Sequence, residues 1–352
     1  MQIDFHHATT YVAARLAGFE PEDAQIVAYA AQYVDDATSS GTVHFDNKAM
    51  YARISTAHRM IDKRNAETLA NHLVWVPFHF LPGNGGLPAG ENPDGRFIEK
   101  IICTPDSPIA RDMVRQTIVE KDKPYGLHRL GVAMHVYADT WAHQGFAGLL
   151  HPVNEVEKAE ELGNSGGFKK KLSSVLNNFL DDAIPPLGHG RALVFPDMPF
   201  LKWRYRNYHG AEIVRDNTDL FCEAANALCM AMQRFIAGDA DADVPGLGDR
   251  DRQTIEDLFR TTTKEDGDKR HDAWLKAIKS GKFSFGPEIV EYAGKGKGSW
   301  KEAALGTNFD LPVHAYREEF LTSNWKRFHD AVLAHRFHVI HDLLPSYGIC
   351  AA

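Results

Sequence analysis

One segment of the 352-residue chain, LHRLGVAMHVYADTWAHQGF at 127–146, constrains the fold more than any other. Its His128, His135, Asp139 and His143 stand at offsets 0, 7, 11 and 15, which correspond to about 0°, −20°, 20° and 60° around an α-helix. Apolar residues occupy most of the other faces. A helix of this kind is usually buried, so the pattern predicts a stripe of polar groups that faces protein. Buried imidazoles and carboxylates need hydrogen-bond partners or a metal.

The spacing of the residues in this stripe indicates how many metal ions they could bind. His135 and His143 lie eight residues apart, or about 12 Å along the helix axis. One ion with bonds of about 2.1 Å cannot readily reach both imidazoles. Asp139 lies one turn from each of them, so the spacing predicts that its carboxylate bridges two metals. The alternative is that the histidines are hydrogen-bonded core groups.

Further candidate metal ligands lie outside this helix, in segments where histidine and aspartate stand beside apolar residues or glycine. An apolar loop around His79 would make an unpartnered imidazole costly, and glycines flank His189. Any one of these residues also fits a solvated or structural role. The candidates are His6 or His7, Asp35 or Asp36, His79, and His189 followed by Asp197.

Composition narrows the class of protein. The 39 lysines and arginines against 47 aspartates and glutamates give a net charge of −8, which argues against a protein that grips duplex nucleic acid but allows a small anionic substrate held by a metal. The four cysteines show no CxxC spacing, which favours reduced thiols. The N-terminus lacks the pattern of a signal peptide, and no apolar run is long enough to span a membrane. We therefore expect a cytoplasmic protein.

Helical periodicity dominates the chain, and the only candidate strand is the short segment 282–285. The sequence therefore predicts an all-α (mainly α) fold and a single domain over residues 1–352. Its metal-site region would cover about 1–200, and a helical C-terminal extension would cover about 201–352. The predicted helices cover about 20–36, 57–73, 108–121, 127–145, 154–162, 168–182, 209–237, 249–261, 268–280 and 313–343.

Several motifs together resemble a known superfamily. The pattern His135-x3-Asp139-x3-His143, with a histidine near the N-terminus and an early helix that ends in aspartate, resembles the zinc-dependent phospholipases C and the fungal single-strand nucleases. The phrases DFHHATTYVAARLAGF, AAQYVDD, FHFLPG and PPLGHG most resemble an uncharacterised bacterial branch of that superfamily. The resemblance covers about residues 3–200 and adds nothing specific beyond them.

The resemblance implies a phospholipase C-like multi-helix bundle around a buried metal centre. Two or three zinc ions, with iron or manganese as alternatives, would supply a metal-bound hydroxide that hydrolyses a phosphoric ester. Asp139 would be the bridging carboxylate, with His135 on one zinc and His143 on another. His6 would be the N-terminal histidine of the site, and Asp35 or Asp36 its early aspartate.

The chain departs from that superfamily at two places. Secreted members use the amine and carbonyl of a mature N-terminal tryptophan as zinc ligands, whereas this sequence begins with Met1. Members also carry a second His-x3-Glu/Asp pair, for which His189 and Asp197 are a looser substitute.

The expected chemistry assigns catalytic roles to two residues. Asp35 would orient the attacking water, and His128 would act as a proton donor, as a hydrogen-bonding neighbour of the ligands, or as a ligand itself. We therefore predict a metal-dependent hydrolase that acts on a small anionic phosphoester. Alternatives are amide hydrolysis, iron redox chemistry, or a non-catalytic helical binding or immunity-type protein.

Overall fold

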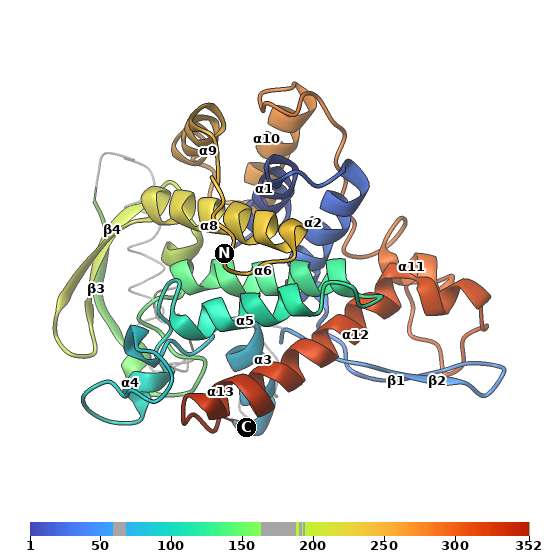
Figure 1. Ribbon diagram of the computed structural model, residues 1–352, viewed down its shortest axis with the longest axis horizontal. Helices are drawn as coiled ribbons and strands as arrows, with labels where there is room; N and C mark the ends of the chain where they lie inside the picture. The colour runs from blue at the N-terminus through green and yellow to red at the C-terminus, as the bar shows by residue number, and fades with distance from the viewer. Residues whose placement is uncertain (59–67, 163–187, 190–191, 193, 352) are drawn as a thin grey trace.

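A long buried helix, α6 (Gly126–Ala142), forms the centre of the computed structural model, which describes all residues except 59–67, 163–187, 190–191, 193 and 352. Every residue of α6 except Leu127 is buried. Helices α2, α5, α8 and α12 pack around it, as Figure 1 shows. The polar stripe of α6 therefore faces protein, as the sequence predicts.

The other elements of the described residues surround this centre. Their bounds are η1 Asp4–Thr9, α1 Thr10–Ala17, α2 Pro21–Asp36, β1 Gly41–His44, β2 Met50–Arg53, α3 Thr68–Phe78, η3 Asn84–Gly86, α4 Ile98–Ile101, α5 Pro108–Val119, η4 Pro152–Asn154, β3 Val156–Glu161, η6 Phe195–Asp197, β4 Lys202–Asn207, β5 Glu212–Asp216, α8 Asn217–Ala237, α9 Asp249–Thr261, α10 Gly267–Lys279, α11 Trp300–Leu305, η7 Glu318–Thr322, α12 Asn324–Phe337, η8 His338–Leu343 and α13 Leu344–Ser346.

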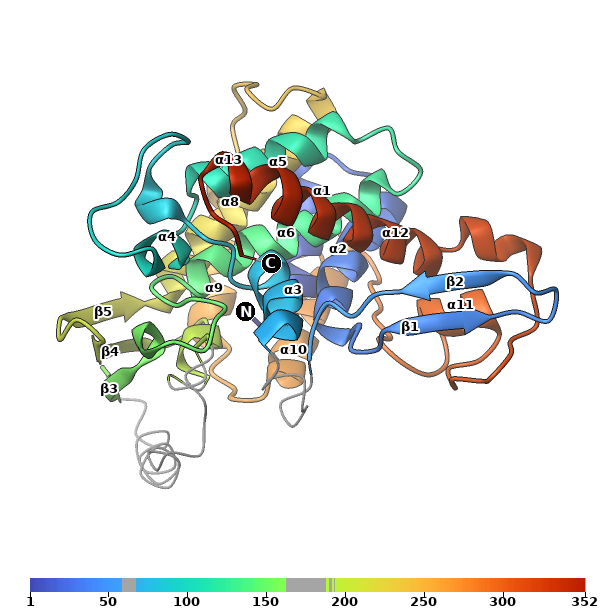
Figure 2. The ribbon, with the colours of Figure 1, turned by 90° about the horizontal axis from the view of Figure 1, so that it is seen from below.

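The all-α prediction is wrong, because the fold is mixed α/β, although mainly helical. Strands β1 and β2 form an antiparallel hairpin, and β3, β4 and β5 form an antiparallel sheet of order β3-β4-β5. The two sheets lie at opposite ends of the molecule (Figures 1 and 2). The segment predicted as a helix over 154–162 contains β3, because it pairs with β4, where Glu157 lies opposite Arg206 and Glu160 opposite Arg204.

Helix boundaries also differ from the prediction. The helix expected from about 209 begins at Asn217, after strand β5, and the helix expected from about 313 begins at Asn324. The segment 282–285 is not a strand, and 168–182 lies outside the described residues. Helix α2, by contrast, ends at Asp36 as predicted, with Pro21 in its first turn.

A glycine sets the distance between α2 and α6. A Cβ atom at Gly131 would lie 2.4 Å from the carbonyl oxygen of Val27 and 2.6 Å from the Cβ of Ala30. Only a residue without a side chain permits this approach. The close packing brings the last turn of α2, which carries Asp35, beside His135 on α6.

A buried ion pair ties the N-terminal segment to helix α10. The guanidinium of Arg270 donates to Asp4 over 2.6 Å from Nε and 3.3 Å from Nη2, and both side chains are fully buried. Arg270 also donates to Gln2 Oε1 and to two carbonyls that precede α10. These bonds hold the first residues of the chain against the C-terminal half.

We expect Arg270→Met to lower the free energy of unfolding by about 3–5 kcal/mol, because it leaves the Asp4 carboxylate buried without its cation. Urea unfolding in a chelator would measure the loss. Asp4→Leu combined with Arg270→Met should recover part of it, since neither charge then stays unpaired; a double variant no more stable than Arg270→Met alone would contradict this account.

Two further observations bear on the sequence analysis. All four cysteines are free. Among the helices of the described residues, none is both long and apolar enough to cross a membrane.

Candidate metal centre

Three segments of the chain meet around the carboxylate of Asp139 on α6. His6 comes from η1 and His79 directly follows α3, while Asp35 lies in the last turn of α2. Sets of histidine and aspartate atoms close enough to hold one ion occur three times among the described residues: His6, Asp35 and His135; His79, His135 and Asp139; and His143, His189 and Asp197. The structure thus brings together eight of the candidate ligands named from the sequence. Asp139 belongs to the set that it forms with His79 and His135.

The tautomers of the histidines follow from their hydrogen bonds. His135 Nδ1 lies 2.8 Å from the carbonyl oxygen of Ala31, and His79 Nε2 lies 2.9 Å from that of Thr56. A carbonyl only accepts, so each of these ring nitrogens carries the proton. In the neutral rings, His135 Nε2 and His79 Nδ1 are therefore bare acceptors.

These two bare nitrogens point at each other and at a carboxylate oxygen. His135 Nε2 lies 3.2 Å from His79 Nδ1, and Asp139 Oδ2 lies 3.3 Å from the first and 3.4 Å from the second. Three lone pairs at this distance repel one another unless a cation lies between them. In a tetrahedral zinc site with bonds of about 2.0–2.1 Å, neighbouring ligand atoms are about 3.3–3.4 Å apart, so the three atoms fit such an ion.

Asp35 lies at the open side of this set. Its Oδ1 is 3.9 Å from both His79 Nδ1 and His135 Nε2, and its side chain is 33% exposed. Asp139, in contrast, is 1% exposed. Asp35 is therefore the group of this set that solvent or a substrate can reach.

The second oxygen of Asp139 faces another group of atoms. Asp139 Oδ1 accepts a hydrogen bond from the α-amino group of Met1 at 2.8 Å and lies 3.2 Å from His6 Nε2. The His6 ring stacks on His135 with centroids 3.8 Å apart, and neither of its nitrogens has a hydrogen-bond partner in the described structure. Asp139 thus presents one oxygen to each of two groups.

A third group of atoms contains His143, one turn beyond Asp139. Its Nδ1 donates to the carbonyl of His79 at 2.7 Å, which leaves Nε2 bare at 3.9 Å from Asp197 Oδ1. His189 Nε2 lies 3.6 Å from Asp197 Oδ2. His143 thus belongs to a different set of ligand atoms from His135.

Burial and charge prepare these side chains to bind a cation. Burial opposes ionisation of Asp139, but His143, the Met1 amine and His135 hold its pKa well below its usual range. Burial lowers the pKa of His143 to about 3 and that of His6 well below its usual value, so both rings are neutral. At His79, burial acts in the same direction, but Asp139 and Asp35 outweigh it and raise the pKa. His6 and His143, as neutral imidazoles beside an ionised carboxylate, are thus in the form that ligates metals, whereas a metal at His79 would displace the proton that its raised pKa favours.

Three other predicted residues lie elsewhere. Where the sequence leaves His6 or His7 open, the structure places His6 at Asp139, while His7 Nδ1 lies 2.8 Å from His271 Nε2. Asp36 accepts a hydrogen bond from Tyr292 at 2.5 Å. His128 donates from Nε2 to Asn324 at 3.0 Å and packs against Trp300, so the structure does not bring it to the three sets.

The environment of His128 leads to a pH prediction. Burial lowers its pKa to about 4, so the unfolded chain binds this proton more readily between pH 6.5 and 4. The free energy of unfolding should therefore decrease as the pH is lowered from 6.5 to 4, and His128 should account for up to about 3 kcal/mol of that decrease. Urea unfolding in a chelator should show that the free energy of unfolding decreases less with falling pH in His128→Gln than in the parent protein. The glutamine amide can still donate a hydrogen bond to Asn324. Equal slopes for the two proteins would contradict the prediction.

Sequence reasoning missed one member of the site. Nothing in the pattern of residues indicates that the Met1 amine would lie between Asp139 and Asp197, 3.3 Å from the latter. The contact depends on the buried helix η1, which turns the first residues into the core. Two signals were available: the closeness of Met1 to His6, and the N-terminal amine that members of the resembled superfamily use as a zinc ligand.

The fold and the site define a mainly helical protein with a largely buried cluster of histidines and aspartates that could hold metal ions. The chain belongs to the DUF6765 family, a family of unknown function whose model matches residues 1–343. Neither the curated proteins nor the solved structures contain a match to it.

Proposed function

We propose that this protein is a metal-dependent hydrolase of phosphoric esters with a centre that would hold two or three metal ions, zinc being the metal that the donor set favours. One observation carries the proposal: three bare acceptor atoms of His79, His135 and Asp139 converge at 3.2–3.4 Å. The backbone carbonyls that hold the far side of each imidazole support it, because metal-ligating histidines are oriented in this way.

A second metal would use the atoms around His143, with His189 and Asp197. A third would use His6 and Asp139 Oδ1, and the Met1 amine would join them after losing the proton that it donates to Asp139. Asp139 would then bridge two ions with its two oxygens. Bound metals in such a centre supply a water of lowered pKa and neutralise charge on phosphoryl oxygens.

The residues of the chain would divide the remaining work. Asp35, which is partly exposed at the edge of the centre, would accept a hydrogen bond from the attacking water and orient it. The buried walls around Asp139 exclude bulk water from the other side. A cytoplasmic location stays a prediction.

The test combines metal content with two kinds of substrate. The full chain, purified without chelator, should hold at least two zinc, manganese or iron ions by elemental analysis. An anomalous-scattering map should place each ion beside His79 and His135, beside His143, or beside His6. It should hydrolyse bis(4-nitrophenyl) phosphate and leave 4-nitroanilides intact, and chelation should abolish the activity until metal is restored. A chain without metal, or one that cleaves only the amide, would contradict the proposal.

A further inference from the structure

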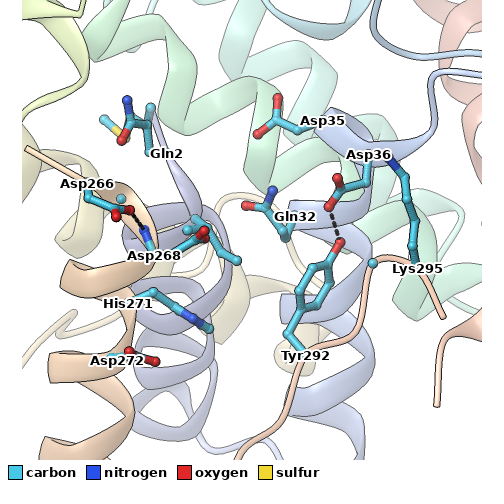
Figure 3. A pocket seen from close by; sticks show the side chains of 14 residues that line it. Gln2, Gln32, Asp35, Asp36, Asp266, Asp268, His271, Asp272, Tyr292 and Lys295 are labelled. Carbon is cyan, nitrogen blue, oxygen red and sulfur yellow. Dashed lines mark hydrogen bonds between the residues drawn. The ribbon is translucent and has the colours of Figure 1, made fainter. Parts of the chain in front are cut away.

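A cavity of about 250 Å³ lies next to the pocket that opens beside the candidate metal centre. Figure 3 shows that larger pocket, whose walls include Asp35, the start of α10 and Lys295. Asp36 and Lys295 line both spaces, and the rest of the smaller one is formed by the end of α2, the end of β2, residues between 301 and 310, and α12. We call it the α2–α12 cavity. A water molecule takes up about 30 Å³ in the liquid, so this cavity has room for a small polyatomic ion.

The charged side chains around the α2–α12 cavity leave a positive excess. Of the described residues that line it, Arg53, Lys295 and Lys301 are cations, while Asp36 and Asp310 are the carboxylates. Asp310 accepts from both Nη atoms of Arg53, at 2.6 and 3.1 Å, and from Lys301 at 2.6 Å, so two cations share one carboxylate. The whole chain carries a net charge of −8, so this local excess runs against the average. The cavity therefore favours an anion.

A buried histidine presents an N–H group to this cavity. His329 on α12 lines it and is 3% exposed. Its Nδ1 accepts from the backbone amide of Ile54 at 3.4 Å, and burial lowers the pKa of the ring to about 3, so the neutral ring carries its proton on Nε2. No described residue accepts that proton, and Nε2 is not sealed in the core. A buried donor left unpaired costs about 1–3 kcal/mol, so the position calls for an acceptor in the cavity.

Two further donors reach the same cavity from other elements. Tyr33 on α2 is 5% exposed, and the indole of Trp325, which can only donate, interacts with its oxygen. The hydroxyl proton of Tyr33 has no acceptor among the described residues. Lys301 on α11 donates to the carbonyl of Asn308 and to Asp310, which leaves one N–H of its ammonium group. Donors from α2, α11 and α12 thus line one space.

We infer that the α2–α12 cavity binds a tetrahedral oxyanion, either a phosphate ion or the phosphoryl group of a larger molecule. The oxygens of such an anion can accept from donors on several sides at once, here from Tyr33, His329 and Lys301. Its charge balances the excess that Arg53 and Lys301 leave over Asp310. Hydrogen bonds to a charged acceptor are stronger than those between neutral groups, so few donors suffice. The site is separate from the candidate metal centre, and side chains alone hold the anion.

Calorimetric titration of the full chain with inorganic phosphate tests the site. The protein is first stripped of metal and freed of chelator, so that the candidate metal centre does not hold the anion. Tyr33→Phe, His329→Asn and Lys301→Gln should each weaken phosphate binding about tenfold, because each removes one donor to a charged group. In His329→Asn the amide oxygen can still accept from Ile54. Urea unfolding without phosphate checks that each variant is folded.

Tyr208→Phe and Lys279→Gln are the matched controls, because they make the same changes at exposed residues that do not line the cavity. Both should bind phosphate as the parent does. Glycerol 3-phosphate separates the two sources of the anion: tighter binding than phosphate indicates a phosphomonoester, and equal or weaker binding indicates the free ion, with the same dependence on the three side chains. A parent chain that binds neither anion at millimolar concentration, or three cavity variants that bind phosphate as well as the controls, would overturn the inference.

Discussion

Asp139→Asn should remove metal from two of the three ligand groups and abolish activity. Its two oxygens face different sets of ligand atoms, Oδ2 toward His79 and His135 and Oδ1 toward His6 and the Met1 amine. An amide keeps the size of the side chain but offers one weaker oxygen ligand and no charge. We expect metal affinity to fall by more than the roughly 10–100-fold that is typical of losing a group that only orients a ligand. Elemental analysis after dialysis against a weak chelator would measure the loss.

The matched control for this variant is His128→Gln, on the same stripe of α6 but bonded to Asn324. It should retain metal. Added zinc distinguishes the two variants further, because a metal stabilises the folded state only of a protein that binds it. The rise in melting temperature on adding zinc to the stripped protein should disappear in Asp139→Asn and persist in His128→Gln. An Asp139→Asn protein with its full metal content would refute the bridging role.

The second large effect is expected from a short extension, Gly-Ser, placed before Met1. The α-amino group is fully buried between Asp139 at 2.8 Å and Asp197 at 3.3 Å. An extension turns this amine into a peptide nitrogen, which has no charge and no lone pair for a metal, and brings extra chain into a buried space. We expect the stripped protein to lose about 3–5 kcal/mol of stability, because two carboxylates lose their buried cation.

The same molecule before and after cleavage provides the control. A protease that cuts directly before Met1 should restore stability, metal content and phosphodiesterase activity together. Urea unfolding and elemental analysis of both forms would measure these changes. If the extended protein kept its metal and its stability, the contact between the amine and Asp139 would have no part in the site.

The helical part of the fold was largely predictable from periodicity. Helices α2 and α6 carry apolar residues at helical spacing, and α2 begins at a proline followed by acids. The strands were not predictable in this way. Segment 156–161 is rich in charged residues, which fit an exposed helix face as well as an edge strand, and only its pairing with β4 decides between them.

The candidate site was predictable where its residues lie on one element. The positions of His135, Asp139 and His143 follow from the helix repeat, and the structure places His135 and Asp139 in one set of ligand atoms and His143 in another. The choice of His6 over His7 and of Asp35 over Asp36 was open, because adjacent residues on a helix end point to different sides. The pocket wall formed by α10 had no signal at all.

Local sequence therefore determined the stripe on α6, since the rise and turn of a helix place its side chains without reference to the rest of the chain. Tertiary structure decided which groups join that stripe. The glycine at 131 lets α2 approach until Asp35 reaches His135, and the Asp4–Arg270 pair holds the chain start where its amine meets Asp139. These contacts join residues more than 90 positions apart, and only packing in three dimensions brings them together.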